Sequence, residues 1–205
     1  MFGTVGRIGL AILDSNLTIA SLLPVKPSAI VWACTSGSFY GGRAWHDALL
    51  GELRARAGAV PVSTAYGFVV DALRALGIAR PAVGTPHGPD ISRWLDVFLT
   101  EHGLGAHPTV GYYGGVVDDY APQEVDDDDI ADFLARLDRP DCDGIVLSCT
   151  GLPSARIVAA VEARIGKPVV TSNQAILWNA LRLGVVAARL SIAPRLLSTL
   201  PAWPP

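Results

Sequence analysis

Two cysteines of this chain stand in matching sequence contexts. Cys34 ends an apolar run and is followed by Thr35-Ser36-Gly37, and Cys149 ends a second apolar run and is followed by Thr150 and Gly151. Backbone N–H groups at a helix start favour a thiolate, and with nearby hydroxyls they can hold a carboxylate or an oxyanion. Such a pair predicts addition or proton transfer at carbon, in which one thiolate attacks or takes a proton and the other thiol donates one.

Other chemistry-bearing residues are interpreted more simply. A lone free cysteine is more often a small core residue than a nucleophile, and Cys142, between two aspartates, is expected to be incidental. The histidines have no metal-ligand spacing with one another or with the cysteines, so we expect no metal. The acidic run 126–129 is interpreted as a solvated helix start. The sequence contains no phosphate-binding or dinucleotide-binding glycine motif, and no cofactor is expected.

An internal repeat surrounds the two cysteines. The segment 30–37, IVWACTSG, resembles 145–151, IVLSCTG, and each is followed later by a second matched pair. In the first copy VPVST leads to a stretch that ends DALRALG, and in the second copy KPVVT leads to one that ends NALRLG. Two matched pairs in the same order indicate a duplicated half-domain.

Short apolar runs alternate with amphipathic stretches along the chain, which predicts an α/β fold of parallel strands buried on both faces. The strands are expected at 7–13, 29–33, 60–63, 81–84, 108–111, 144–148 and 167–171. The helices are expected at 42–57, 65–76, 90–102, 126–137, 154–165 and 174–183.

The repeat predicts two pseudo-symmetric lobes of parallel sheet flanked by helices. We expect residues 1–60 and 171–205 to form the first lobe and residues 61–170 the second, with a shared cleft at the carboxyl ends of the strands. Only 17 residues separate Asn16 from Cys34, whereas 61 separate His87 from Cys149. The first lobe is therefore expected to be abbreviated by about one helix–strand–helix block.

Composition excludes several functional classes. The 205 residues carry a net charge of −3 and are 50% apolar, which excludes a disordered chain. Arginines are scattered, so no nucleic-acid partner is expected, and no apolar run is long enough to predict a membrane partner. The odd number of cysteines favours a reducing, cytoplasmic setting. Both lysines precede prolines, which argues against a pyridoxal enzyme.

The segments RIGLAILDSNLT, ACTSGSFYGG, DALRALG, GIVLSCTGLPS and KPVVTSNQAILWNALRLG carry a family resemblance. The chain resembles the aspartate/glutamate racemase superfamily, in particular its maleate cis-trans isomerase and arylmalonate decarboxylase branch. The resemblance implies an α/β fold, no cofactor and a small carboxylate substrate. It is carried by most of residues 7–184, and the ACTSGS and SCTG motifs are its most specific part.

The resemblance implies roles for single residues. Cys34 corresponds to the nucleophile that adds to a maleate-type double bond, and Cys149 to the acid that protonates the adjacent carbon. Asn16, Thr35 and Ser36 are expected to bind substrate carboxylates, as are Thr150 and Gly151. His87 stands where the isomerase branch usually has a tyrosine, and it either replaces that hydrogen bond or is an ordinary loop residue.

Several activities stay open at this point. The expected reaction is cofactor-independent cis-trans isomerisation of a small unsaturated dicarboxylate. Arylmalonate decarboxylases have glycine in place of the first cysteine, so Cys34 argues against that activity. An amino-acid or hydantoin racemase would also use two cysteines, and the short first lobe leaves room for an inactive family member. A homodimer would cover apolar surface that the short lobe exposes.

Overall fold

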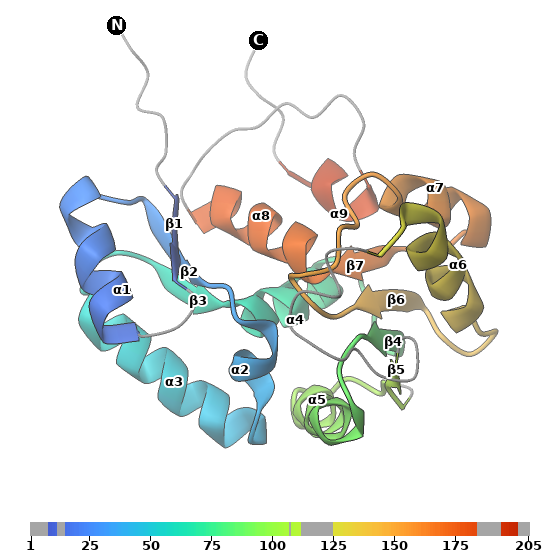
Figure 1. Cartoon of the computed structure of the whole chain (residues 1–205), viewed down its shortest axis with the longest axis horizontal. Coiled ribbons are helices and arrows are strands. Elements are labelled where there is room, and N and C mark those ends of the chain that lie inside the picture. The colour runs from blue at the N-terminus through green and yellow to red at the C-terminus, as the bar shows by residue number, and fades with distance from the viewer. Residues whose placement is uncertain (1–7, 12–14, 107, 112–124, 184–193, 201–205) are drawn as a thin grey trace, which may run out of the picture.

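The computed structural model describes residues 8–11, 15–106, 108–111, 125–183 and 194–200. Two parallel sheets lie side by side with helices around them (Figure 1). The first has the order β1-β2-β3, formed by Ile8–Ala11, Ala29–Trp32 and Val62–Thr64. The second has the order β5-β4-β6-β7, formed by Val110–Gly111, Pro81–Thr85, Gly144–Leu147 and Val169–Thr171. The predicted α/β fold with parallel sheets is confirmed.

The helices fill the connections between strands. In the first half of the chain they are α1 (Ser15–Leu22), the 3-10 turn η1 (Leu23–Val25), α2 (Thr35–Phe39), α3 (Gly42–Ala57) and α4 (Ala65–Ala75). In the second half they are α5 (Pro89–Glu101), α6 (Asp127–Leu137), α7 (Val158–Ile165), α8 (Ser172–Leu183) and α9 (Arg195–Ser198).

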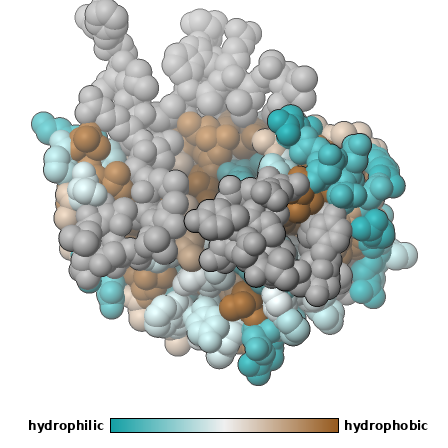
Figure 2. All heavy atoms as spheres, viewed as in Figure 1, coloured by the Kyte–Doolittle hydropathy of each residue, from teal (hydrophilic) through white to brown (hydrophobic). Residues whose placement is uncertain are grey.

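Local sequence explains where the repeated helices begin and end. The Thr64 hydroxyl accepts a hydrogen bond of 3.0 Å from the Gly67 amide and so caps α4. Gly77, at φ 69°, takes the left-handed conformation that ends this helix. The acidic run does start a helix, because Asp126 caps α6 through a 2.8 Å bond from the Asp128 amide. Hydrophilic side chains gather over α6 and α7 at the right of Figure 2.

The two helices that end the repeated segments cross between the sheets. α4 and α8 pack against each other, while α4 also contacts β7 and α8 also contacts β2. Buried Asn179 of α8 donates a 3.2 Å hydrogen bond to the Phe68 carbonyl of α4. The lobe boundaries at 60 and 171 stay a prediction, with one structural qualification: β3 lies beyond residue 60 but pairs with β2 of the first sheet.

The first lobe is shorter than the second, but by less than the repeat predicts. Between β4 and β6 the chain forms α5, β5 and α6, whereas the described chain between β1 and β2 forms α1 and η1. One helix of the expected missing block is therefore present, and the described part of the lobe lacks a strand and a helix. The unpredicted α1 has no helical hydrophobic stripe in its SNLTIASL sequence, which explains why periodicity did not reveal it.

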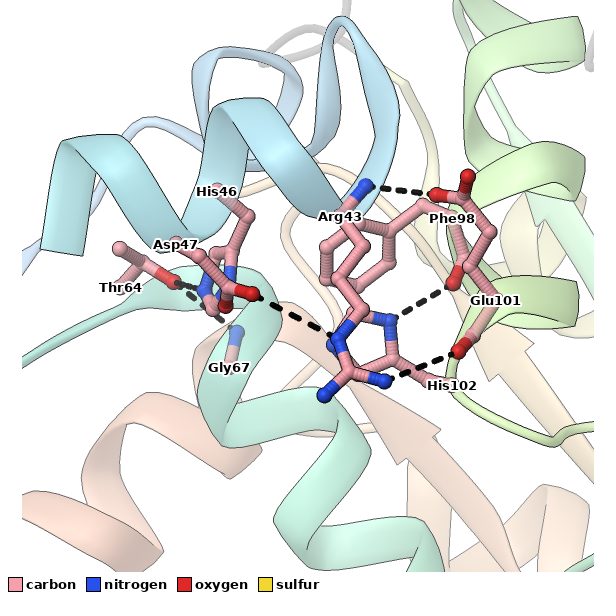
Figure 3. A network of polar contacts seen from close by, with 8 residues as sticks. All are labelled: Arg43, His46, Asp47, Thr64, Gly67, Phe98, Glu101 and His102. Carbon is pink, nitrogen blue, oxygen red and sulfur yellow. Dashed lines mark hydrogen bonds and ion pairs between the residues drawn. The ribbon is translucent and has the colours of Figure 1, made fainter.

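A polar network clamps α3 of the first lobe against α5 of the second (Figure 3). The Arg43 amide donates a 2.6 Å hydrogen bond to the Glu101 carboxylate. Buried His46 places Nε2 at 2.9 Å from the Thr64 hydroxyl and Nδ1 at 3.5 Å from Asp47. The His46 ring also lies edge-on to His102 at 5.9 Å. These contacts join α3, the start of α4 and the end of α5 into one unit.

We expect the stability of the protein to fall in acid partly because of His46. Burial lowers the pKa of His46 below its ordinary 6.5, against a smaller opposing effect of its hydrogen bond to Asp47; His102 and Arg54 lower it further. The unfolded chain then binds a proton more readily than the folded chain, so the free energy of unfolding decreases as the pH falls below about 6.5. Urea unfolding at pH 7.5 and pH 5.0 measures this change, which His46→Gln should reduce.

His87→Gln is the control for this measurement, because His87 lies outside the clamp. It should leave the pH dependence closer to that of the natural sequence than His46→Gln does. Equal pH dependence in the natural sequence and in His46→Gln would contradict the assignment.

No helix in the described part of the chain is both long and apolar enough to cross a membrane.

Candidate functional site at the carboxyl ends of the strands

Cys34 and Cys149 both follow the carboxyl end of a central strand. Cys34 comes two residues after β2 and is the N-cap residue of α2. Cys149 comes two residues after β6. The Thr150 hydroxyl donates a 3.4 Å hydrogen bond to the carbonyl of Ala33, across 117 positions of sequence. The loop that carries the second cysteine therefore touches the loop that carries the first.

The Cys34 side chain lies against the first turn of α2. A Cβ added to Gly37 would come within 2.9 Å of the Cys34 sulfur, so only glycine at position 37 leaves the thiol its present place. The amide and the hydroxyl of Ser38 donate to the Cys34 carbonyl at 3.2 and 2.6 Å. Half-buried Cys34 is thus held at a defined point of the strand–helix junction.

The Cys149 backbone takes an unusual conformation. Its φ is 156°, a value that residues with a side chain rarely adopt. The conformation is fixed by a 3.3 Å hydrogen bond from the Cys149 amide to the hydroxyl of buried Ser172, the first residue of α8. The Gly151 amide donates to the Cys149 sulfur at 3.3 Å and so holds the side chain at a defined point of the loop. Strain that the surroundings impose in this way is typical of functional sites.

The loop after Cys149 is held from α8. The Asn173 side-chain amide donates hydrogen bonds to the carbonyls of Thr150 and Leu152 at 3.2 and 3.3 Å. Sequence analysis did not select Ser172 or Asn173. Their signal is their place directly after Thr171, where the second repeat passes from strand to helix.

The predicted carboxylate-binding residues lie at the same edge of the sheets. Buried Thr35 and half-buried Ser36 start α2, directly after Cys34. His87 is half-buried between β4 and α5, and its amide donates a 3.3 Å hydrogen bond to Thr85. Asn16 lies in the first turn of α1, beyond the end of β1, and its side chain is outside the described atoms.

Buried polar atoms without a hydrogen-bond partner gather near these strand ends. Within the described chain they include Trp32 Nε1, Thr35 Oγ1, Ser154 Oγ and Gln174 Nε2. The first two flank Cys34, and the other two lie in the segments that follow β6 and β7. Most buried polar groups in proteins are paired, so each of these atoms is a candidate to bind a polar ligand or water.

Tyr66 fills the interior behind the site. It is fully buried, lies edge-on to Phe39 of α2 at 4.8 Å and to Phe98 of α5 at 5.7 Å, and places its hydroxyl beside Ser148. Burial raises the pKa of Tyr66 well above 10, so the phenol stays protonated and cannot serve as a base. Its role is to support α2 and the end of β6. Sequence analysis did not single it out.

Cys142 lies away from this edge, packed in the core of the second lobe. Its sulfur is 3.6 Å from the Lys167 ammonium and 3.8 Å from Asp138. The described residues contain no group of three or more histidine, cysteine or acidic side chains that could hold a metal ion.

Comparison with known proteins agrees with this arrangement. The family model described as arylmalonate decarboxylase matches residues 11–197. The arylmalonate decarboxylase of Bordetella bronchiseptica is 37% identical over 176 residues, which are 84% of this chain and 72% of that protein.

Solved structures give the same result. A crystal structure of arylmalonate decarboxylase superimposes with a TM-score of 0.81 at 33% identity, over 88% of this chain and 79% of the other. The maleate isomerase Iso of Pseudomonas putida S16 superimposes with a TM-score of 0.83 at 25% identity, over 91% of this chain and 76% of the other. The predicted resemblance to the racemase superfamily is confirmed, and the chain belongs to the arylmalonate decarboxylase family of enzymes, which resembles maleate isomerase in fold.

Proposed function

We propose that the protein is a cofactor-independent cis-trans isomerase of a small unsaturated dicarboxylate, of the maleate-to-fumarate type. The observation that carries the proposal is the pair of cysteines at two strand ends whose loops are joined by the Thr150–Ala33 hydrogen bond. One thiol from each lobe can then act on one small substrate. A solved structure of a relative that is 25% identical, the Pseudomonas putida isomerase, holds maleate and supports this substrate class.

The reaction starts with addition. The Cys34 thiolate forms a bond to one carbon of the double bond, and the π electrons move to the neighbouring carbon, which takes a proton from the Cys149 thiol. The former double bond is now single and can rotate. Transfer of a proton back to the Cys149 sulfur and cleavage of the carbon–sulfur bond give the trans product and restore the Cys34 thiolate and the Cys149 thiol.

The surrounding groups suit a doubly charged substrate. The Thr35 hydroxyl beside Cys34 is buried and has no partner among the described residues, and Ser36 adds a second hydroxyl from the same loop. We assign Thr150 and Gly151 to substrate binding from the other loop, where they would exchange their present hydrogen bonds to Ala33 and Cys149 for bonds to the substrate. We assign Asn16 and His87 to the carboxylates as well, because both follow strands that end at this edge. Donors placed before the reaction stabilise the negative charge that develops on the carbon after addition and on the attached carboxylate.

A second candidate is decarboxylation of an arylmalonate, which the 37% identical relative favours. Loss of CO₂ would leave an enediolate, and the Cys149 thiol would protonate its carbon. Cys34 has no necessary part in that reaction, whereas the isomerase reaction uses both cysteines. Amino-acid or hydantoin racemisation would use both thiols as acid and base.

Proton NMR with separate substrates distinguishes these activities. The purified protein is incubated in D₂O with maleate, phenylmalonate, L-aspartate, L-glutamate and a hydantoin, and the products are followed over time. We expect conversion of maleate to fumarate. Formation of phenylacetate from phenylmalonate would instead indicate a decarboxylase. Deuterium at the α-carbon of an amino acid or at C5 of a hydantoin would indicate a racemase. Absence of every reaction would indicate an inactive member of the family.

We propose further that the protein acts in the cytoplasm, where its three free cysteines would stay reduced, and that it forms a homodimer. A dimer would add cover to the shorter first lobe.

A further inference from the structure

The inference concerns Trp32, which the proposed mechanism does not use. Trp32 is the last residue of β2 and comes two positions before Cys34. In an extended segment, residues two positions apart point to the same face, as Trp32 and Cys34 should. Its side chain is 92% buried, yet the indole Nε1 has no hydrogen-bond acceptor within the described chain. A buried N–H without a partner destabilises the fold unless something else binds it.

Trp32 Nε1 lies close to Gly37. A Cβ built on Gly37 would lie 3.7 Å from Trp32 Nε1 and 2.9 Å from Cys34 Sγ. The indole N–H and the thiol therefore lie on the same side of Gly37, where a side chain at position 37 would collide with the sulfur. The hydroxyl of Thr35, the residue after Cys34, is also buried and has no hydrogen-bond partner among the described residues.

This combination of groups suits a carboxylate oxygen. An indole N–H only donates, so its partner must be an acceptor, and a threonine hydroxyl can donate to the same acceptor group. After addition to an unsaturated dicarboxylate, one carboxylate is carried by the carbon bonded to Cys34. Its oxygens must lie close to the sulfur, on the side of Gly37 that the sulfur shares with Trp32 Nε1.

We propose that the Trp32 indole N–H binds the substrate carboxylate next to the carbon that Cys34 attacks, and so helps to select dicarboxylates. The inference rests on the proposed function, since it requires a carboxylate substrate at Cys34. Trp32 would thus determine substrate specificity on the side of the cleft that carries Cys34.

The indole signals of the protein test the proposal without turnover. The chain has five tryptophans, and ¹⁵N–¹H spectra resolve one indole N–H signal for each. The signal that disappears in Trp32→Phe is assigned to Trp32. Titration with succinate, a saturated dicarboxylate that cannot be attacked, should move this signal downfield, while sodium chloride at matched ionic strength should not.

A matched control is Trp178→Phe. Trp178 is also buried, but its indole N–H already donates a 2.8 Å hydrogen bond to Thr199. Succinate should slow alkylation of Cys34 by iodoacetamide in the natural sequence and in Trp178→Phe alike. In Trp32→Phe about tenfold more succinate should be needed for equal protection, because a hydrogen bond to a charged group is lost. The alkylation rate without succinate should stay the same.

A second variant changes the surroundings of Nε1 and keeps the indole. Gly37→Ala places a methyl group 3.7 Å from Nε1 and within 2.9 Å of the present position of the sulfur, and it should abolish the succinate shift of the Trp32 signal. Melting temperatures show whether each variant is folded.

Each outcome has one meaning. The inference is overturned, and the proposed function is unaffected, if succinate does not move the Trp32 indole signal and protects Cys34 from alkylation equally well in Trp32→Phe and in the natural sequence. Slower alkylation of Trp32→Phe without succinate would also overturn it, because Trp32 would then act on the thiol. If neither succinate nor maleate protects Cys34 or moves any signal, the proposed function fails and the inference fails with it.

Discussion

Replacing Cys34 or Cys149 by alanine will lower the turnover of maleate by at least about 10³-fold, because each variant removes a group that forms or breaks a bond in every cycle. Cys34→Ala has no atom that can add to the double bond. Cys149→Ala leaves the adduct without its proton donor. The measurement is the initial rate of fumarate formation at saturating maleate.

Cys142→Ala is the control for this loss. Cys142 is buried beside Lys167 and Asp138 in the second lobe, away from the strand ends that carry the other two cysteines. Its rate should stay within about twofold of the natural sequence, since a neutral change away from reacting atoms removes no transition-state contact. An essential Cys142, or a dispensable Cys34, would contradict the assignment of the nucleophile.

The largest effect on stability is expected from Tyr66→Ala. Removal of a buried aromatic ring costs about 3–5 kcal/mol in free energy of unfolding, which in a chain of this size lowers the melting temperature by roughly 6–20 °C. Turnover of the folded fraction should fall too, because the ring supports α2 through Phe39 and the end of β6 through Ser148. Urea unfolding and rates below the transition separate the two effects.

Two variants accompany this measurement. Tyr66→Phe keeps the ring and loses only the hydroxyl beside Ser148, so it should cost about 1 kcal/mol. Tyr40→Ala removes an aromatic ring that is 50% exposed and should cost less than about 1 kcal/mol. If Tyr66→Ala is no more destabilising than Tyr40→Ala, Tyr66 does not hold the two lobes together.

The predicted strands were found at their expected places because each is a run of apolar residues that only a sheet covered on both faces can bury. Ile30, Val31, Ile145 and Val146 are fully buried. The helices with a clear apolar stripe were also found, and α3 has the expected bounds, 42–57. α2 could not be predicted, because TSGSF is five residues long and contains a glycine at the place where Cys34 needs room.

Candidate site residues could be selected from the sequence where their chemistry is visible in the residue type, and not where their place in the site depends on packing. The cysteines and their hydroxylated neighbours could be selected from the repeat. Ser172, Tyr66 and Trp32 could not, since a serine at a helix start and aromatics in apolar runs are ordinary core and capping residues. Only their surroundings distinguish them: Ser172 bonds to Cys149, Tyr66 packs on Phe39, and Trp32 lies next to Gly37 and Cys34.

The strand order of the second sheet has a consequence for how such chains change length in evolution. β4 pairs with β6 on one side and with β5 on the other, so β5 is an outermost strand. By the pseudo-symmetry, its counterpart in the first lobe would lie outside β1, and β1 pairs with β2 directly without it. A deletion there shortens the lobe but preserves the β1–β2–β3 register and leaves Cys34 at its strand end. Insertions and losses of about one supersecondary unit can therefore occur at this edge while the strands that carry the two cysteines keep their pairing.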